Sequence, residues 1–187
     1  MDETELETAL REAQMGSSIA FGQVYGEFST RVFGLCRKML GSHAAAEDAT
    51  SEVFERAYEA LGQYDRDRPF DRWILTIASR HCLNRLRRER LEKRLFHDEP
   101  VEVPAAAASS SPLVAFENRE QRRALLLAID ALPENYRVPL ILKYYGDLSY
   151  DEIAEHLGTT RNNVAVLLHR AKRELRVGIG ASRKEES

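Results

Sequence analysis

A proline- and serine-rich segment near the middle of the chain interrupts an otherwise helical pattern. It reads HDEPVEVPAAAASSSPLVA at residues 97–115, where Pro100, Pro104 and Pro112 frame small residues and a run of serines. This composition is typical of a flexible, partly extended linker. A surface loop within one domain is the alternative interpretation, but structureless loops of this length are uncommon in compact domains. We therefore expect domains at 1–96 and 117–180, a flexible linker at 97–116 and a polar tail at 181–187.

Proline and glycine are scarce on both sides of this segment, which favours an all-α fold. The 187 residues include only 6 prolines and 10 glycines, and 43% of the side chains are hydrophobic. Long stretches without a helix breaker, with apolar residues at helical spacing, predict two helical domains. The first is expected to contain four helices, at about 3–14, 18–40, 44–61 and 69–95, and the second begins with helices at about 116–131 and 134–145.

The sequence LSYDEIAEHLGTTRNNVAVLLHRAKRELR, residues 148–176, predicts two further helices joined by a tight turn. Ser149 and Glu152 form a capping box at the start of the first helix. Gly158 ends that helix because glycine enters the left-handed region at little cost, and Thr159 or Thr160 then caps the second helix. Two helices joined by a short turn containing glycine are the helix-turn-helix pattern of DNA-binding proteins.

The second helix of this pair carries the residues that would contact DNA. In a helix-turn-helix, side chains near the start of that helix reach base edges in the major groove, and basic side chains farther along contact phosphates. An ordinary helical hairpin with a solvated charged face is the alternative, but the small Ala154 and the apolar residues around Gly158 favour DNA binding. The candidate base-reading residues are Thr160, Arg161, Asn162, Asn163, Ala165, Val166, His169 and Arg170, with Lys172, Arg173 and Arg176 extending the basic side.

Charge is unevenly distributed along the chain, although the formal net charge is only -3. Residues 1–30 contain several acids and a single base, Arg11, whereas residues 80–94 contain many bases and only two acids, Glu89 and Glu92. The local field decides what binds to a surface. The acidic total therefore does not argue against a nucleic-acid partner, and it indicates a second, different partner for the acidic surfaces.

The sequence AEDATSEVFERAYEAL, residues 46–61, predicts an amphipathic helix with an acidic outer side. Its apolar residues recur at helical spacing, and Phe54 and Tyr58 are expected to join the core. A solvated acidic face is the simpler interpretation of the outer side, and a docking face for a basic partner is the alternative. The residues of the candidate docking face are Asp48, Ser51, Glu52 and Glu55.

The sequence YDRDRPFDRWILTIASRHCLNRLRRERLEKR, residues 64–94, predicts a polar loop followed by a basic helix. Trp73, Ile77 and Leu83 are expected to be core residues. Basic and amide side chains on one helix face suit phosphates and base edges, and an aromatic beside polar groups can hold an unstacked base. Packing of Tyr64 under the loop, with the arginines serving only solubility, is an equal alternative. The candidate nucleic-acid residues are Tyr64, Asp65, Asp67, Arg80, Asn84, Arg87 and Arg88.

The sequence offers no catalytic or cofactor-binding set. No histidine lies at metal-binding spacing from another histidine or a cysteine, and no glycine-rich phosphate loop is present. We therefore expect neither enzymatic activity nor a cofactor nor a metal. The N-terminal sequence does not resemble a signal peptide, no apolar run is long enough for a membrane helix, and Cys36 and Cys82 are expected to be reduced, buried thiols of a cytoplasmic protein.

Several of these segments together resemble the extracytoplasmic-function group of bacterial sigma-70 family sigma factors, in family order. They are AFGQVYGEFSTRVFGLCRKMLG, AEDATSEVFERAYEAL, RPFDRWILTIASRHCLNRLRR, ALPENYRVPLILKYYGDLSYDEIAEHLGTTRNNV and LLHRAKRELR. The resemblance spans nearly everything except the linker and the two tails. It implies family region 2 in the first domain, family region 4 in the second, and a linker in place of region 3.

The resemblance also implies partners for each surface. The acidic helix would dock on the clamp of the RNA polymerase largest subunit, and the loop with the basic helix would read the minus-10 element and trap a flipped-out base. The C-terminal pair would read the minus-35 element and sit on the polymerase flap, while the linker threads toward the RNA exit path. An anti-sigma factor is implied as a regulator.

The chain departs from the family pattern in its recognition helix. Family members often carry a basic and then a small polar residue where this chain has Ala165 and Val166, which can contact a thymine methyl but cannot donate hydrogen bonds. The minus-35 sequences of better-known members therefore do not transfer to this chain. An autonomous helix-turn-helix regulator that binds DNA without polymerase is the alternative function, but it leaves residues 64–94 unexplained.

Overall fold

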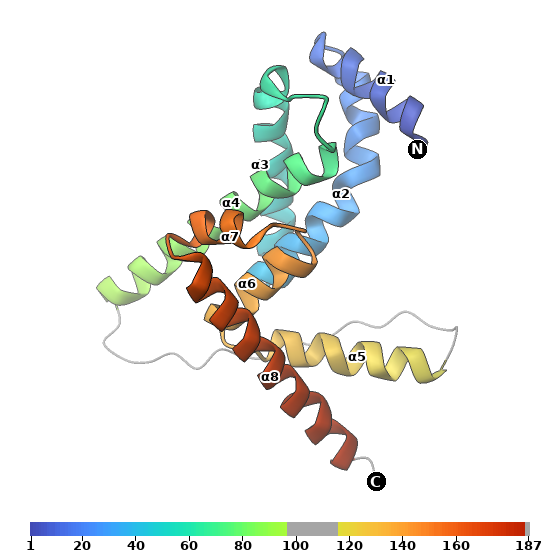
Figure 1. Cartoon of the computed structure of the whole chain (residues 1–187). Coiled ribbons are helices and arrows are strands. Elements are labelled where there is room, and N and C mark those ends of the chain that lie inside the picture. Colours follow the sequence, from blue (N-terminus) through green and yellow to red (C-terminus); the bar gives the residue numbers. More distant parts are fainter. Residues whose placement is uncertain (97–115, 186–187) are drawn as a thin grey trace. The chain divides into compact units, whose positions relative to one another are not determined.

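The computed structural model describes the backbone of residues 1–96 and 116–185, with side chains described at 1–92 and 123–177. The chain divides into two compact units, 1–95 and 96–187 (Figure 1). Both units are helical throughout their described parts apart from short turns. The linker predicted at 97–116 falls, apart from its last residue, outside the described residues.

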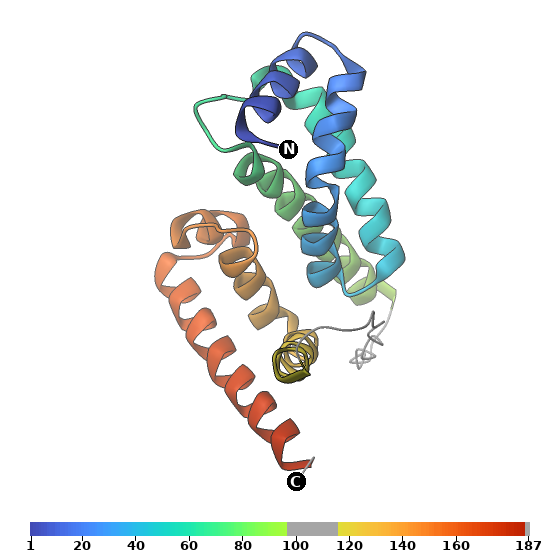
Figure 2. The same cartoon turned by 90° about the vertical axis from the view of Figure 1, so that its right-hand side faces the viewer.

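The first unit contains helices α1 (Glu3–Gln14), α2 (Ser18–Leu40), α3 (His43–Ala60) and α4 (Phe70–Phe96), with the short 3-10 helix η1 (Leu61–Gln63) after α3. Helices α2 and α3 pack side by side, and α1 packs on α2 (Figures 1 and 2). The N-terminal amine of Met1 lies 3.0 Å from a carboxylate oxygen of Glu27, so α1 runs back along the first half of α2.

Local sequence explains where these helices begin and end. Asp2 starts α1 with a capping box to Glu5, and Ser17 and Ser42 cap α2 and α3 through their side chains. Gly41 ends α2 in the left-handed conformation at φ 74°. The predicted helix limits of this unit therefore lie within one residue of the observed limits.

The core of the first unit is formed by α2, α3 and α4. Both cysteines are free and fully buried in it, as expected. The hydrogen bond between the two thiols and the burial of Cys82 raise the pKa of Cys82 well above its usual range. The largest fully buried side chains of this unit are Val24, Val32, Leu35, Met39, Val53, Leu61, Ile74 and Leu75.

The second unit contains α5 (Phe116–Asp130), α6 (Glu134–Tyr144), α7 (Tyr150–Leu157) and α8 (Arg161–Glu185). Helix α8 packs against the other three helices of this unit. Leu142, Leu148, Ile153, Val164 and Leu168 are almost completely buried between them. Helix α8 continues to Glu185, so the predicted polar tail from residue 181 is helical through that residue.

Gly146 follows α6 because of close packing and not because of its backbone conformation. A glycine directly after a helix often ends it in the left-handed conformation, yet the residue in that region here is Asp147, at φ 52°. A Cβ atom on Gly146 would lie 2.9 Å from the Leu142 carbonyl oxygen and 2.9 Å from a methyl group of Leu148. Gly146 is therefore required by close packing of the chain against the end of α6.

Candidate nucleic-acid interfaces

Tyr64 is a buried residue at the start of the loop that joins η1 to α4. The residue is 6% exposed, and its ring centroid lies 5.2 Å from that of Phe70 and 5.0 Å from that of Trp73. The hydroxyl donates a hydrogen bond to the Arg68 carbonyl. Burial, followed by the nearby charges of Asp65 and Asp71, raises the pKa of Tyr64.

This packing corrects the expectation that the Tyr64 ring is presented to a base. The alternative that the sequence left open, a tyrosine packed under the loop, describes the structure. The physical reason is the aromatic cluster with Phe70 and Trp73, which the ring completes.

The outer side of the loop is polar and locally ordered. Residues 65–68 are all exposed. The Asp65 carboxylate accepts a hydrogen bond from the Asp67 backbone at 3.1 Å, and the Asp65 carbonyl accepts one from the Arg68 backbone at 3.1 Å. Asp65 therefore shapes the turn as well as contributing charge to its surface.

Helix α4 presents a basic stripe to solvent. Arg80, Asn84, Arg87 and Arg88 are all exposed, as predicted. The first three lie at spacings of four and three residues, so they share one side of the helix. Side chains that donate hydrogen bonds from one helix face suit phosphates and base edges.

Trp73 is an addition to this stripe that sequence reasoning missed. We expected Trp73 and Ile77 in the core, but both are half-buried, whereas Leu83 is buried as expected. The series 73, 77, 80, 84 follows the same helical spacing as the basic stripe, which was the available signal. The half-exposed indole thus lies at the loop end of a row of basic and amide side chains.

The outer side of α3 is acidic and exposed. Asp48, Ser51, Glu52 and Glu55 all reach solvent. Glu52 lies 3.7 Å from Nε2 of His81, a side chain of α4 that is only 9% exposed. Burial lowers the pKa of His81, and the Glu52 carboxylate opposes that shift.

An aromatic surface borders this acidic face. Tyr25 and Tyr58 are 44% and 43% exposed, so the expectation that Tyr58 joins the core was wrong. The ring centroids of Phe21 and Tyr58 lie 4.9 Å apart, and those of Tyr25 and Phe54 lie 4.5 Å apart. Exposed aromatic rings beside carboxylates give α2 and α3 the mixed character of a protein-binding surface.

The turn between α7 and α8 has the predicted helix-turn-helix geometry. The capping box between Ser149 and Glu152 starts α7, and Gly158 ends it in the left-handed conformation at φ 64°. The Thr159 backbone donates to the Ala154 carbonyl at 2.9 Å, which is the outer hydrogen bond of a Schellman motif. Ala154, whose carbonyl accepts this bond, is itself buried on α7.

The predicted base-reading residues are all exposed on the first turns of α8, but some of them have local partners. Thr160 caps α8 by accepting a hydrogen bond from the Asn163 backbone at 3.2 Å, and the Asn163 side chain donates to the Thr159 hydroxyl at 2.8 Å. Arg161 lies 3.5 Å from the Asp151 carboxylate on α7. The residues without such a role that project from the helix are Asn162, Ala165, Val166, His169 and Arg170.

The basic side of α8 continues past these residues. Lys172, Arg173 and Arg176 are exposed. The Lys172 ammonium lies 5.2 Å from the centroid of the Tyr144 ring, and Tyr144 raises the pKa of Lys172. Lys172 is therefore held near α6 as a permanent positive charge.

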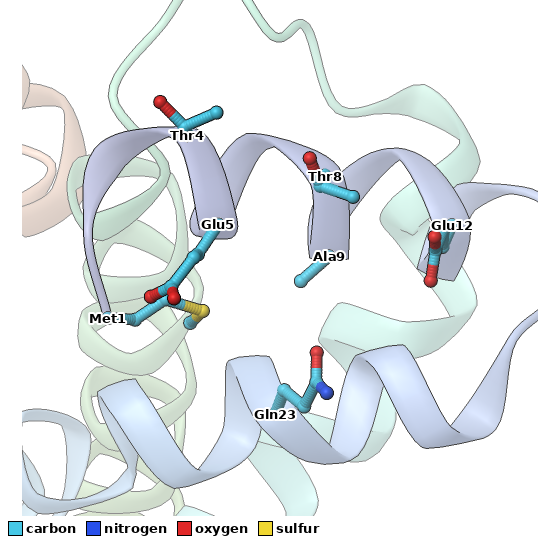
Figure 3. Close-up of a pocket in the computed structure, with 7 residues that line it drawn as sticks. All are labelled: Met1, Thr4, Glu5, Thr8, Ala9, Glu12 and Gln23. Atoms are coloured by element: carbon cyan, nitrogen blue, oxygen red, sulfur yellow. The ribbon is translucent and has the colours of Figure 1, made fainter.

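A shallow recess between α1 and α2 is chemically unlike these surfaces (Figure 3). Its lining includes the carboxylates of Glu5 and Glu12, with Gln23 facing α1 from α2. Among the described residues, no group of three histidine, cysteine or acidic side chains is placed to hold a metal ion. Within the same residues, no helix has the length and apolar character needed to cross a bilayer.

Two family models match this chain in sequence order. The model described as Sigma-70 region 2 matches residues 24–92, and the model described as Sigma-70, region 4 matches residues 122–175. The chain belongs to the sigma-70 family. Region 2 of this sigma factor thus covers most of α2, all of α3 and α4 as far as residue 92, whereas α1 precedes it.

Curated relatives place the sigma factor in the extracytoplasmic-function group. It is 28% identical over 173 residues to the ECF RNA polymerase sigma factor SigW of Bacillus subtilis, covering 89% of this chain and 92% of SigW. It is 26% identical over 182 residues to the ECF RNA polymerase sigma factor SigK of Mycobacterium ulcerans, covering 95% of both chains.

Solved structures share the fold of this sigma factor. CnrH, in complex with the cytosolic domain of CnrY, matches with a TM-score of 0.57 at 21% identity, over 95% of this chain and 98% of that chain. RpoE of Bartonella quintana, in complex with the anti-sigma factor NepR, matches with a TM-score of 0.58 at 18% identity, over 86% of this chain and 96% of that chain.

Proposed function

We propose that this sigma factor directs core RNA polymerase to its promoters with two DNA-reading surfaces, one on each unit. The loop and basic stripe of region 2 would open and read the minus-10 element, and α8 would read the minus-35 element. The observation that carries this proposal is the row of Trp73, Arg80, Asn84 and Arg87 on α4. An autonomous regulator that uses only the helix-turn-helix has no role for that row.

The minus-10 step needs binding energy and no chemistry of its own. Unstacking one base costs a few kcal/mol, and stacking a base on an aromatic ring returns about 1–3 kcal/mol. Trp73 is the half-exposed ring beside the polar loop, and Tyr64 supports it from the buried side. The exposed arginines of α4 would hold the phosphates of the separated strand.

The acidic face of α3 supplies the surface for polymerase in this proposal. Asp48, Ser51, Glu52 and Glu55 would contact a basic part of the clamp of the largest subunit, with the bordering Tyr25 and Tyr58 adding apolar contact. Complementary charge favours fast and specific association at this surface. The acidic and basic surfaces of region 2 thus have different partners.

Minus-35 readout would depend on Asn162, His169 and Arg170, with Ala165 and Val166 offering apolar contact to thymine methyl groups. Thr160, Asn163 and Arg161 would contribute mainly to the shape of the turn and to phosphate contacts, because their side chains already have local partners. The flap of the polymerase is the protein partner we propose for this unit.

Regulation by an anti-sigma factor in the cytoplasm completes the proposal. CnrH and RpoE, which share the fold, were each solved with a regulatory protein, the cytosolic domain of CnrY and the anti-sigma factor NepR. We propose a partner of the same class for this chain. The protein would thus act without enzymatic activity, by controlled binding to polymerase.

Transcription with purified components tests this function. The full-length protein is added to core RNA polymerase with a library of genomic fragments, and the transcript starts are sequenced. Discrete starts that require the protein, preceded by shared minus-35 and minus-10 sequences, are expected. An absence of protein-dependent starts, together with binding of duplex DNA by the protein alone, would instead indicate the autonomous regulator.

A further inference from the structure

The last residue of α1 ties that helix to the loop proposed to open the promoter. Nε2 of Gln14 donates hydrogen bonds to the carbonyl oxygens of Leu61 and Tyr64, each at 3.0 Å. Carbonyl oxygens only accept hydrogen bonds, so both N–H groups of the amide are used at once. The contact joins positions that are 47 and 50 residues apart in the sequence.

The two carbonyl groups mark the beginning of the loop. The Leu61 carbonyl also accepts the Tyr64 backbone N–H at 3.1 Å, which closes η1. Tyr64 is therefore held by its carbonyl to α1, by its ring to Phe70 and Trp73, and by its hydroxyl to the Arg68 carbonyl. The loop between Tyr64 and Arg68 is fixed at both of its ends.

The half-buried position of Gln14 strengthens this connection. The side chain comes from a helix whose inner face, Ala9, Leu10 and Ala13, is buried. A donor held by a packed helix loses little further freedom when it binds, so it fixes the loop more firmly than a mobile surface side chain would. A loop that is already ordered when it meets a base avoids the entropic cost of becoming ordered at that moment.

We propose that Gln14 is a positioning residue for promoter opening, which orders the loop that starts at Tyr64 so that region 2 can hold an unstacked base. This inference rests on the proposed function and assigns to α1, which precedes the matched region 2, a part in minus-10 recognition. Gln14 itself does not contact DNA in this proposal. Its effect passes through the backbone of the loop.

The test is a thermodynamic cycle between Gln14 and the captured base. Holoenzyme is assembled with the wild-type protein or with Gln14→Met, which keeps the length of the side chain and removes both donors. Affinity is measured for the single-stranded minus-10 oligonucleotide of a promoter that the wild type opens. The same oligonucleotide is then used with an abasic site at each position in turn.

At the position of the captured base, we expect Gln14→Met to weaken binding of the intact strand about tenfold, the change produced by about 1.4 kcal/mol. Binding of the strand that is abasic at that position should differ between the two proteins by less than about twofold, because the ordered loop no longer has a base to hold. Affinity for core polymerase should stay equal in both proteins.

Gln23→Met serves as the matched control. Gln23 is exposed on α2 and lines the recess beside α1 (Figure 3). The same substitution there should change neither the affinity for the minus-10 strand nor the affinity for core polymerase. Gln14→Glu is the second variant, since it keeps the shape of the side chain but turns an acceptor toward two carbonyl oxygens. It should reproduce the loss at the same base.

Two results would overturn the proposal. Equal affinities of the wild type and both Gln14 variants for the intact strand would show that the loop needs no support from α1. A loss of equal size on intact and abasic strands, or a parallel loss of core binding, would show that Gln14 acts only on the stability of the unit. A wild-type holoenzyme that opens no promoter would contradict the proposed function itself, which is a different outcome from either of these.

Discussion

Trp73 lies against Tyr64 with the ring centroids 5.0 Å apart and the rings inclined by 46°. The tyrosine is buried beneath the loop while the indole is half-exposed on the basic side of α4. In the proposed function the two aromatic residues therefore have separate tasks. Tyr64 would support the loop from inside, and Trp73 would offer a ring face to an unstacked base.

Replacement of Trp73 by alanine is expected to reduce promoter opening more than polymerase binding. Loss of a stacking ring removes about 1–3 kcal/mol of base binding, so open complexes on a duplex promoter should fall by about tenfold or more. Permanganate reactivity of unpaired thymines measures this directly. Trp73→Phe should retain part of the activity, and Leu91→Ala, an exposed apolar change on the same helix, should retain all of it.

An equal loss of core affinity and of open complexes in Trp73→Ala would contradict that role. It would mean that the indole serves the fold of the first unit through its packing against Tyr64 and Phe70. The free energy of unfolding of the variant, measured in urea, separates a stacking role from a structural role. A purely structural loss lowers this free energy, and core affinity and open complexes then decrease together.

Reversal of charge at Glu52 is expected to weaken binding to core polymerase. Glu52 lies in the middle of the exposed acidic face of α3, and a lysine there would repel a basic partner surface. We expect Glu52→Lys to lower the affinity for core about tenfold, as measured by fluorescence anisotropy of the labelled protein at low and high salt. The loss should shrink at high salt because screening weakens charge repulsion.

Glu7→Lys on α1 is the control for this charge reversal. It makes the same change in net charge on an exposed helix face of the same unit, away from the proposed docking surface. Core affinities that decline equally in both variants would point to a general charge effect. An unchanged affinity in Glu52→Lys would remove α3 from the proposed interface.

Two glycines of the second unit should respond differently to alanine. At Gly146 a Cβ atom would meet a backbone oxygen at 2.9 Å, so we expect Gly146→Ala to cost about 1–3 kcal/mol of stability through overpacking. At Gly158 there is open space but a φ of 64°, so Gly158→Ala should cost about 1–2 kcal/mol through backbone strain.

Hydrogen exchange of the backbone amides tests both substitutions in the intact chain. Faster exchange should extend through α6 and the start of α7 in Gly146→Ala, and should centre on the turn between α7 and α8 in Gly158→Ala. If the amides around residue 146 exchange in Gly146→Ala at the same rate as in the wild type, the packing explanation is contradicted.

Much of the fold follows from local sequence. The capping box of Ser149 and Glu152, the left-handed Gly158 and the helix start after Ser17 each depend on residues within one turn of each other. Such features can be predicted because their partners are near in sequence. The exposed faces of α3, α4 and α8 likewise follow from helical spacing.

The features of the candidate site that could not be predicted from the sequence depend on contacts between distant segments. Periodicity places Trp73 on the same stripe as Arg80, but only tertiary packing decides that Tyr64 and Phe70 pack against the indole and that it stays half-buried. The bonds from Gln14 to Leu61 and Tyr64 have no sequence signal at all. The sequence shows that position 146 is a glycine. The reason that a larger residue would not fit there, the nearby Leu142 carbonyl, is visible only in the structure.

His81 should make the stability of the first unit depend on pH. Burial lowers the pKa of His81 below its ordinary value, and the positive charges of Arg56, Arg85 and Arg88 lower it further, while Glu52 opposes the shift. The unfolded chain therefore binds a proton at higher pH than the folded chain does. Stability contributed by the neutral imidazole is present above the unfolded pKa of about 6.5 and falls as the pH drops toward the folded value.

The single tryptophan, Trp73, lies in the same unit and reports its unfolding. Urea titrations followed by tryptophan fluorescence between about pH 7.5 and pH 5.5 should show the free energy of unfolding decreasing as the pH falls. In His81→Gln, which cannot take up a proton, the decrease should be smaller. A slope that is the same in His81→Gln and in the wild type would show that the buried imidazole does not govern this dependence, and that other groups of the unit do.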